Sequence, residues 1–210
     1  MKPLTTEIAT EICPYCSRIL DGFDALRMHV VTNHANEPVP NPPGTITVTV
    51  NRQVYRTRVE PEWTLYYFLH DVMGLTGAKQ ICDHGMCGSC TVIADGRAIL
   101  SCMTLAIECD GKNIETVEGI AAAGHPLVEE YVQHHCMQCG YCTPGFVVTA
   151  KALLDENPAP STEEIVESLG GNLCRCGTYP QHVKAIKAAA AKLAKASESR
   201  ADQSSESAQK

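Results

Sequence analysis

Three of the twelve cysteines lie in one short segment, and their spacing can hold a metal cluster. Four residues separate Cys82 from Cys87, and two residues separate Cys87 from Cys90. A fourth cysteine, Cys102, follows twelve residues after Cys90. This spacing is typical of a plant-type [2Fe–2S] cluster, in which a short loop supplies three thiolates and a more distant cysteine supplies the fourth. We therefore predict such a cluster here and an electron-transfer role for the chain.

Two glycines and a histidine lie within the same segment. Gly85 and Gly88 suit a loop whose backbone passes close to inorganic sulfur with unusual dihedral angles. His84 raises the alternative of a Rieske centre, in which two histidines replace two cysteines on one iron. The next pair, Cys87 and Cys90, has no histidine between its members, so we interpret His84 as a solvent-exposed loop residue.

A second set of cysteines lies in the C-terminal half of the chain. It contains three cysteines spaced by two residues and a later pair spaced by one: Cys136, Cys139, Cys142, Cys174 and Cys176. Residues two apart on a helix point in nearly opposite directions, so the later pair must lie in a loop to share a metal. Thr143 and Pro144 favour a helix start directly after Cys142, where free amides stabilise an anionic site. The spacing leaves open whether Cys136 or Cys142 joins Cys139, and whether the metal is iron–sulfur or zinc.

The N-terminal segment carries a third metal-binding pattern. Two residues separate Cys13 from Cys16, twelve separate Cys16 from His29, and four separate His29 from His34. Two thiolates and two imidazoles at this spacing are typical of a tetrahedral Zn²⁺ site in a ββα zinc finger. We therefore predict zinc at these four residues.

The predicted finger lacks the features of a nucleic-acid reader. Leu20 and Leu26 fit the core of a ββα unit, but the helix positions that would reach bases hold Gly22, Ala25 and Met28. None of these side chains can form a bidentate base contact. The chain has a net charge of −7, whereas nucleic-acid binding requires a basic face. We interpret the segment as a zinc-stapled docking unit, with no nucleic acid as partner.

The elements around the first cysteine set indicate strands packed on a helix. Residues 45–50 alternate in polarity with β-branched side chains and predict a strand, and residues 54–59 predict a second one. Thr64 is a suitable N-cap for a helix whose apolar residues include Val72. A turn at residues 95–96 would return the chain so that a strand delivers the fourth cysteine. By analogy, this order is the β-grasp layout of plant-type ferredoxins.

The C-terminal part is predicted to be helical. Helices are expected at residues 125–135, after Thr143, after a capping box formed by Ser161 and Glu164, and after Pro180. Four helices joined by short loops predict a compact bundle. The fold class is thus α+β. The expected order is a zinc-finger-like extension (1–34), a Pro-rich linker (35–44), a β-grasp [2Fe–2S] domain (45–119), a helical-bundle [2Fe–2S] domain (120–196) and a disordered tail (197–210).

Four ordered motifs resemble the iron–sulfur subunit of the xanthine oxidase family of molybdenum hydroxylases. They lie at residues 74–79, 87–92, 138–145 and 171–177, and the resemblance covers residues 45–195. The ending Cys-Gly-Thr-Tyr-Pro at residues 176–180 is most similar to bacterial enzymes with a separate small subunit, such as isoquinoline and aldehyde oxidoreductases.

The resemblance implies a ligand set and a partner. The β-grasp cluster would be held by Cys82, Cys87, Cys90 and Cys102, and the bundle cluster by Cys139, Cys142, Cys174 and Cys176. Gln138 and Cys139 would lie against the pterin of a molybdenum cofactor bound in a large partner subunit. Electrons would leave through the bundle cluster and then the β-grasp cluster to a flavin subunit or another acceptor. Cys109 and Cys136 remain as non-ligands, Cys109 as a core residue.

The chain departs from the family pattern at three places. Ile81 replaces a glycine before the first cluster cysteine, Arg52 replaces the glycine of an Asn-Gly turn, and residues 1–44 have no counterpart. A redox sensor that binds nucleic acid is the alternative function, and a stand-alone ferredoxin does not explain the second cysteine set. No apolar stretch is long enough to span a membrane, and the N-terminus lacks a secretory core, so we expect a cytoplasmic protein.

Overall fold

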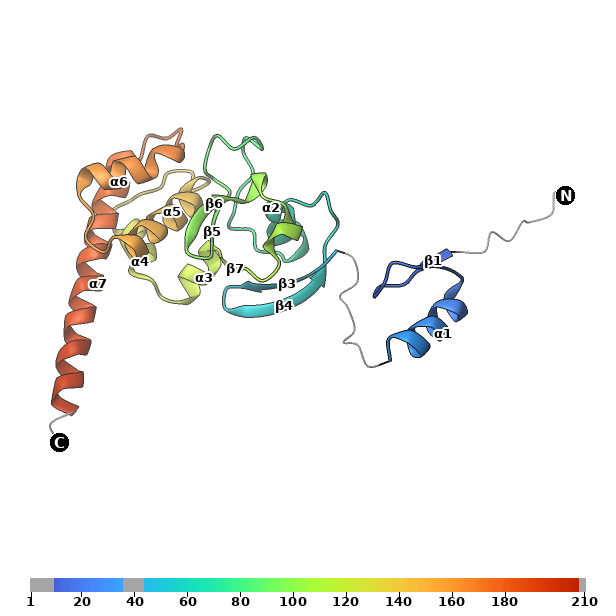
Figure 1. The fold of residues 1–210 in the computed structure, drawn as a ribbon. Coiled ribbons are helices and arrows are strands. Elements are labelled where there is room, and N and C mark those ends of the chain that lie inside the picture. The colour runs from blue at the N-terminus through green and yellow to red at the C-terminus, as the bar shows by residue number, and fades with distance from the viewer. Residues whose placement is uncertain (1–9, 36–43, 208–210) are drawn as a thin grey trace. The chain divides into compact units, whose positions relative to one another are not determined.

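The computed structural model describes residues 10–35 and 44–207, and the chain forms two compact units (Figure 1). The first unit spans Met1–Thr45 and the second spans Ile46–Lys210. In the first unit a small hairpin precedes one helix: β1 (Thr10–Ile12), β2 (Ile19–Asp21) and α1 (Phe23–Asn33). None of the helices in the described ranges is long and apolar enough to cross a membrane.

The second unit contains a five-stranded sheet with the strand order β4-β3-β7-β5-β6. Strand β7 runs parallel to β3 and antiparallel to β5, and β5 is antiparallel to β6. The strands are β3 (Thr45–Val50), β4 (Gln53–Arg58), β5 (Thr91–Ala94), β6 (Arg97–Leu100) and β7 (Asn113–Glu115). Together with the helices, the sheet confirms the predicted α+β class.

A two-residue turn joins β3 and β4, although it contains no glycine. Asn51 and Arg52 have φ angles of 50° and 70°, which is the left-handed region that a tight hairpin turn requires. Asn51 is held there because its side-chain amide donates to Thr116 Oγ1 and its side-chain oxygen accepts from the Thr116 amide, both at 2.9 Å. Arg52 in place of the family's glycine therefore does not lengthen the turn, which has two residues.

The helix predicted after Thr64 is present, but it is wound differently from the expectation. Thr64 accepts a hydrogen bond from the Tyr67 amide and caps α2 (Leu65–Tyr67), as predicted. The chain then continues as a π-helix over Phe68–Val72. Because a π-helix has more residues per turn than an α-helix, Val72 leaves the buried face and is 46% exposed. Val72 thus departs from the helical spacing that the sequence predicts.

The C-terminal part contains five α-helices within the described residues. They are α3 (Val117–Ala122), α4 (Pro126–Gln133), α5 (Thr143–Glu156), α6 (Thr162–Ser168) and α7 (Tyr179–Ser207). The predicted capping box is confirmed, because Ser161 accepts from the Glu164 amide and Glu164 accepts from the Ser161 amide. Short 3₁₀ helices lie at Ser101–Met103, Ala106–Cys109 and Leu169–Gly171.

Strand β5 lies between two hydrophobic cores and contributes residues to both. All four of its residues are buried, which is typical of a strand that is covered on both faces. Val92 and Ala94 pack with the sheet-and-helix core, whereas Ile93 packs with the core formed by the C-terminal helices. Helix α5 lies against β5, as Figure 1 shows. The two cysteine-bearing parts of the second unit are therefore built on one shared strand.

Helix α7 is longer than the sequence predicts. The expected disordered tail at residues 197–210 is wrong for residues 197–207, which continue the helix. Once a helix is nucleated by packing, each further residue adds a hydrogen bond at little cost, and these residues include no glycine or proline. Ser197 and Ser199 also donate to the carbonyl oxygens of Ala194 and Ala196. Residues 208–210 lie outside the described residues.

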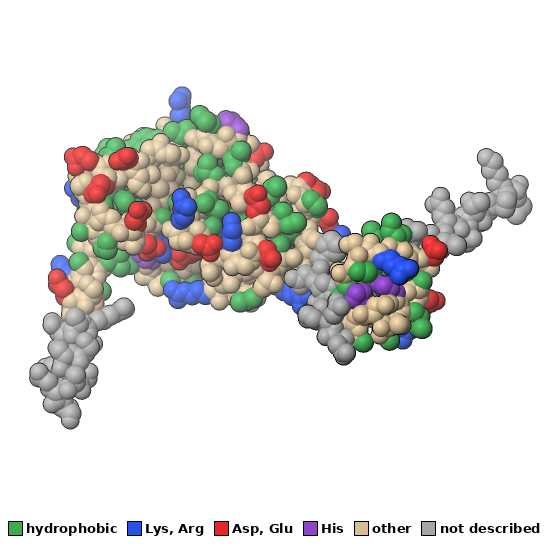
Figure 2. Space-filling view, in the orientation of Figure 1, with side chains coloured by type: hydrophobic (Ala, Val, Ile, Leu, Met, Phe, Trp, Pro, Cys, Tyr) green, Lys and Arg blue, Asp and Glu red, His purple; other side chains and the backbone are tan. Residues whose placement is uncertain are grey.

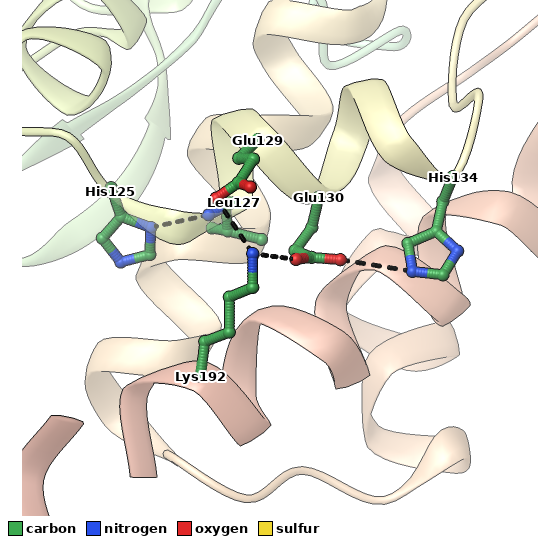
Figure 3. Close-up of polar contacts among 6 residues, drawn as sticks. All are labelled: His125, Leu127, Glu129, Glu130, His134 and Lys192. Carbon is green, nitrogen blue, oxygen red and sulfur yellow. Dashed lines mark hydrogen bonds and ion pairs between the residues drawn. The ribbon is translucent and has the colours of Figure 1, made fainter. Parts of the chain in front are cut away.

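A buried carboxylate joins α4 to α7 (Figure 3). Glu130 is 5% exposed, and its carboxylate lies 2.6 Å from Lys192 Nζ and 3.3 Å from His134 Nε2. The exposed Glu129 binds the same lysine nitrogen at 2.9 Å. One lysine thus contacts a buried and an exposed acid on adjacent residues.

We predict that Glu130→Gln lowers the melting temperature by roughly 5 °C, because it leaves two cationic or polar partners without a buried anion. Glu129→Gln is the matched control, and we expect it to change the melting temperature by at most about 1 °C because exposed ion pairs contribute little. Thermal unfolding followed by circular dichroism measures both. Equal effects of the two substitutions would contradict the assignment of Glu130 as the structural partner.

Candidate metal centres

The first cysteine set lies in an irregular loop at residues 79–90. Asp83, Gly85 and Gly88 have φ angles of 56°, 77° and 69°, so three residues of this loop adopt the left-handed region. Two of the three are the glycines that the sequence singles out. Ile81 keeps a negative φ and is 54% exposed, so this position does not require a glycine. The departure at Ile81 is therefore compatible with the loop.

The fourth cysteine of this set comes from a 3₁₀ helix and not from a strand. Strand β6 ends at Leu100, and Cys102 lies in the short helix that follows. Ser101 holds the junction, because its hydroxyl donates to the Cys90 carbonyl oxygen at 2.7 Å. The predicted strand thus ends two residues before Cys102, and the 3₁₀ helix that follows it carries the cysteine.

The sulfurs of the first set are arranged in two pairs. The Cys82 side chain interacts with Cys87 and the Cys102 side chain with Cys90, and charge on Cys82 also acts on Cys102. Three of the four are buried, and Cys82 is partly exposed. The structure therefore brings together the four cysteines that the sequence groups, and it leaves one edge of the set accessible.

The second set is also arranged in two pairs. The Cys139 and Cys176 sulfurs lie 3.8 Å apart, and the Cys142 side chain interacts with Cys174. Cys142 is the N-cap residue of α5, so this pair lies at a helix N-terminus as expected. Cys136 is fully buried in the helical core, where burial raises its pKa to about 11. The geometry thus groups Cys142, and not Cys136, with Cys139.

Each set contains one cysteine whose pKa is lowered by hydrogen bonds and one whose pKa is raised by burial. Backbone hydrogen bonds from His84 and Met86 lower the pKa of Cys82 to about 6, whereas burial raises the pKa of Cys102 to about 11. In the second set, burial raises the pKa of Cys142 to about 12. Burial also acts to raise the pKa of Cys174, but donors led by Thr178 outweigh it and bring the value to about 7. Thiolate character is what metal binding requires.

Both sets open onto one cavity of 620 Å³. Six of the eight sulfur ligands predicted from the sequence line it: Cys82, Cys87, Cys139, Cys142, Cys174 and Cys176. Exposed apolar side chains share its lining, among them Ile81, Met86 and Leu173. The two sets are therefore neighbours on one partly apolar surface.

Backbone contacts at Gly88 hold the two sets together. The Gly88 carbonyl oxygen accepts from Asn172 Nδ2 at 3.0 Å, and the Leu173 amide donates to the Cys87 carbonyl oxygen at 3.0 Å. A Cβ on Gly145, in the first turn of α5, would overlap with the same Gly88 oxygen. The first loop, the start of α5 and the loop at residues 172–176 thus meet at one point.

The third candidate site lies in the first unit, where four ligand atoms converge. Those of Cys13, Cys16, His29 and His34 all lie within 4.8 Å of one another. Asn33 Nδ2 lies 3.1 Å from His29 Nδ1, and His29 Nε2 lies 3.2 Å from the Cys16 sulfur. Figure 2 shows the histidine side chains of this unit beside each other at its surface.

The short distances between its ligand atoms distinguish the third site from the two cysteine sets. Among the residues that the structure describes, the Cys/His group is the one set of three or more such ligands that fits around a single ion. The eight cysteines of the second unit form pairs that are spread more widely. A single tetrahedral zinc ion with bonds of about 2.3 Å needs four sulfurs in mutual contact, whereas a two-iron cluster takes two sulfurs at each iron.

Three residues near the second set were missed by sequence reasoning. Asn172 contacts the first loop, Thr178 Oγ1 lies 3.2 Å from the Cys174 sulfur, and His182 lies 3.0 Å from Thr178. Thr178 and His182 follow Cys174 at intervals of four residues, and this spacing could have pointed to both from the sequence.

Comparison with known proteins identifies relatives of the chain. Residues 116–187 match the [2Fe-2S] binding domain family. The nicotine 6-hydroxylase small subunit of Paenarthrobacter nicotinovorans is 45% identical over 150 residues, which cover 71% of this chain and 91% of that protein. The chain belongs to the iron–sulfur small subunits of the xanthine oxidase family of molybdenum hydroxylases.

Further relatives support the same family assignment for this small subunit. The nicotinate dehydrogenase small FeS subunit of Eubacterium barkeri is 41% identical over 152 residues, which cover 71% of this chain and 97% of that protein. The crystal structure of quinoline 2-oxidoreductase from Pseudomonas putida 86 matches with a TM-score of 0.68 and 44% identity, over 72% of this chain and 95% of that chain.

We predict that Gly145→Ala lowers the melting temperature of the small subunit by roughly 3–10 °C, because the new Cβ would overlap with a backbone oxygen. Helix propensity alone would give the opposite sign, since alanine is favoured over glycine inside a helix. Gly170→Ala is the control, because a Cβ at Gly170 meets open space. A stabilised Gly145→Ala variant in thermal unfolding would refute the close contact.

Proposed function

We propose that this chain is the electron-transfer subunit of a molybdenum-dependent hydroxylase or dehydrogenase. In this proposal residues 45–119 form a β-grasp [2Fe–2S] domain and residues 120–196 form a helical-bundle [2Fe–2S] domain. The observation that carries the proposal is that six of the eight cysteines of the two sets line one cavity, with the sulfurs of one pair, Cys139 and Cys176, 3.8 Å apart. Paired sulfurs suit two-iron clusters and argue against a Cys₄ zinc ion at the second set.

The proposed ligands follow from this pairing. Cys82, Cys87, Cys90 and Cys102 would hold one cluster, and Cys139, Cys142, Cys174 and Cys176 would hold the other. A [2Fe–2S] cluster, when bound, takes up and releases single electrons. The chain's own residues fix the sulfurs in place, bury Cys90 and Cys102 from water, and donate amide hydrogen bonds to Cys82. Hydrogen bonds and burial of this kind set the reduction potential of such a centre.

A large partner subunit would cover the cavity between the two sets. Two named relatives are small subunits, which implies larger companions in those proteins. In this chain Gln138 and Cys139 are exposed, and Gln138 Nε2 lies 3.4 Å from the Cys176 carbonyl oxygen, beside the second set. We place the pterin of the partner's molybdopterin against these two residues. A flavin subunit or another acceptor would then receive electrons from the first set.

Zinc in the first unit completes the proposal. The four ligand atoms within 4.8 Å fit one tetrahedral Zn²⁺ ion, which would staple the small ββα unit. The acidic chain and the residues at Gly22, Ala25 and Met28 support a docking role without nucleic acid. The described residues contain no disulfide, and clustered cysteines without disulfides are typical of a reducing compartment, so we propose a cytoplasmic location.

The function is tested by metal content and electron paramagnetic resonance of the natively expressed protein. We expect about four irons and one zinc per chain, two distinct [2Fe–2S] signals after reduction, and a large molybdenum-containing subunit that co-elutes in gel filtration. One signal alone, or zinc in place of iron at the second set, would be incompatible with the proposal.

A pair of alanine variants tests the ligand assignment. Cys142→Ala should remove one of the two signals and about half of the iron, because it takes one sulfur from the second set. Cys136→Ala removes a sulfur from the same sequence motif but from the hydrophobic core, so both signals should remain. If Cys136→Ala removes a signal and Cys142→Ala does not, the assignment is wrong.

A further inference from the structure

A short hydrogen-bonded chain runs from the second cysteine set into the helical core. Thr178 Oγ1 lies 3.2 Å from Cys174 Sγ on one side and 3.0 Å from His182 Nε2 on the other. Thr178 is 4% exposed and His182 is completely buried. Three side chains spaced by four residues, two in the loop before α7 and one in its first turn, thus connect a candidate ligand sulfur to a buried imidazole.

The surroundings of His182 are aromatic. Its ring stacks on Phe146 with a centroid distance of 4.1 Å and an interplanar angle of 5°, and the Tyr131 ring lies 5.3 Å away. Among the described residues His182 Nδ1 has no hydrogen-bond partner. Burial lowers the pKa of His182 to about 4, so the ring is neutral at pH 7. A neutral imidazole carries one proton, on either Nδ1 or Nε2.

The direction of both hydrogen bonds follows from where that proton lies. A proton on Nδ1 would leave a buried N–H donor without an acceptor, which proteins rarely tolerate. A proton on Nε2 instead donates to Thr178 Oγ1. The threonine hydroxyl then has its own hydrogen free, and the acceptor within reach is the Cys174 sulfur. Both hydrogen bonds therefore point from the core toward the sulfur.

We propose that His182 is a positioning residue that fixes the Thr178 hydroxyl as a hydrogen-bond donor to Cys174 and thereby raises the reduction potential of the centre held by the second set. The inference rests on the proposed function. A donor aimed at a ligand sulfur withdraws negative charge from it, which favours the reduced, more anionic state. Thr178 and His182 would together favour the location of a shared electron at the second set over the first.

Aromatic packing alone does not account for a histidine at this position. A phenylalanine could stack on Phe146 equally well, and it would bury no polar atoms. The imidazole leaves Nδ1 unsatisfied, which costs free energy of folding. The bond to Thr178 is what an imidazole adds here beyond an apolar ring.

The test is an electron paramagnetic resonance redox titration of the full-length, cluster-loaded protein. Thr178→Val removes the hydroxyl at nearly constant volume and should shift the midpoint potential of the second-set signal to lower values, with the first-set signal unchanged. Thr178→Ser keeps the hydroxyl and should retain the wild-type potential. His182→Phe keeps the ring but not the donor and should shift the same signal in the same direction, by less than Thr178→Val. His182→Gln restores an N–H near the Nε2 position and should reverse most of that shift.

The double variant separates positioning from packing. If His182 acts through the threonine hydroxyl, Thr178→Val combined with His182→Phe should have the same potential as Thr178→Val alone. An additional shift in the double variant, or no shift in either single variant, overturns the inference. Should His182→Phe fail to fold, the Thr178→Val and Thr178→Ser pair still decides whether the hydroxyl sets the potential. Fewer than two wild-type signals would overturn the proposed function as well, so the two failures are distinguishable.

Discussion

The carbonyl oxygen of Gly88 is the contact on which the arrangement of the second unit depends. It accepts hydrogen bonds from Thr91 Oγ1 at 2.6 Å and from Asn172 Nδ2 at 3.0 Å, and it lies so close to Gly145 that no side chain fits there. Buried carbonyl groups need such partners, and here one comes from the same segment and the other from a segment far along the chain. Both cysteine sets are anchored within a few residues of this oxygen, so their relative position is fixed by close backbone contacts and by buried side-chain hydrogen bonds.

Strand β5 extends this rigidity from the contact to the whole unit. Its buried residues face the sheet core on one side and the helical core on the other, so neither core can move without the other. Centres that exchange electrons need a fixed separation and a fixed environment. The cavity shared by the two sets is lined with exposed apolar side chains, which suits a surface that a partner covers. The N-terminal unit has its own compact group of candidate metal ligands.

Local patterns predicted much of the second unit, and long-range contacts account for what they missed. The cap at Thr64, the capping box at Ser161 and the glycines at Gly85 and Gly88 depend on neighbouring residues and were predictable. The π-helix that exposes Val72 was not predictable, because sequence patterns assume the roughly 3.6-residue period of an α-helix. The contact of Asn172 with Gly88 and the stacking of His182 on Phe146 arise only when separate segments meet, so local spacing does not predict them. Cysteine spacing grouped the second set but did not decide whether Cys136 belongs to it. The burial of Cys136 in the helical core depends on tertiary packing.

The central claim is that two clusters are held side by side in one rigid unit. The most direct test is electron paramagnetic resonance at successive stages of reduction of the native protein. Two clusters lining one cavity should interact magnetically, so each signal should broaden or split once both are reduced, while the half-reduced sample shows a simple signal. Two signals that add without any change in line shape at full reduction would contradict the claim.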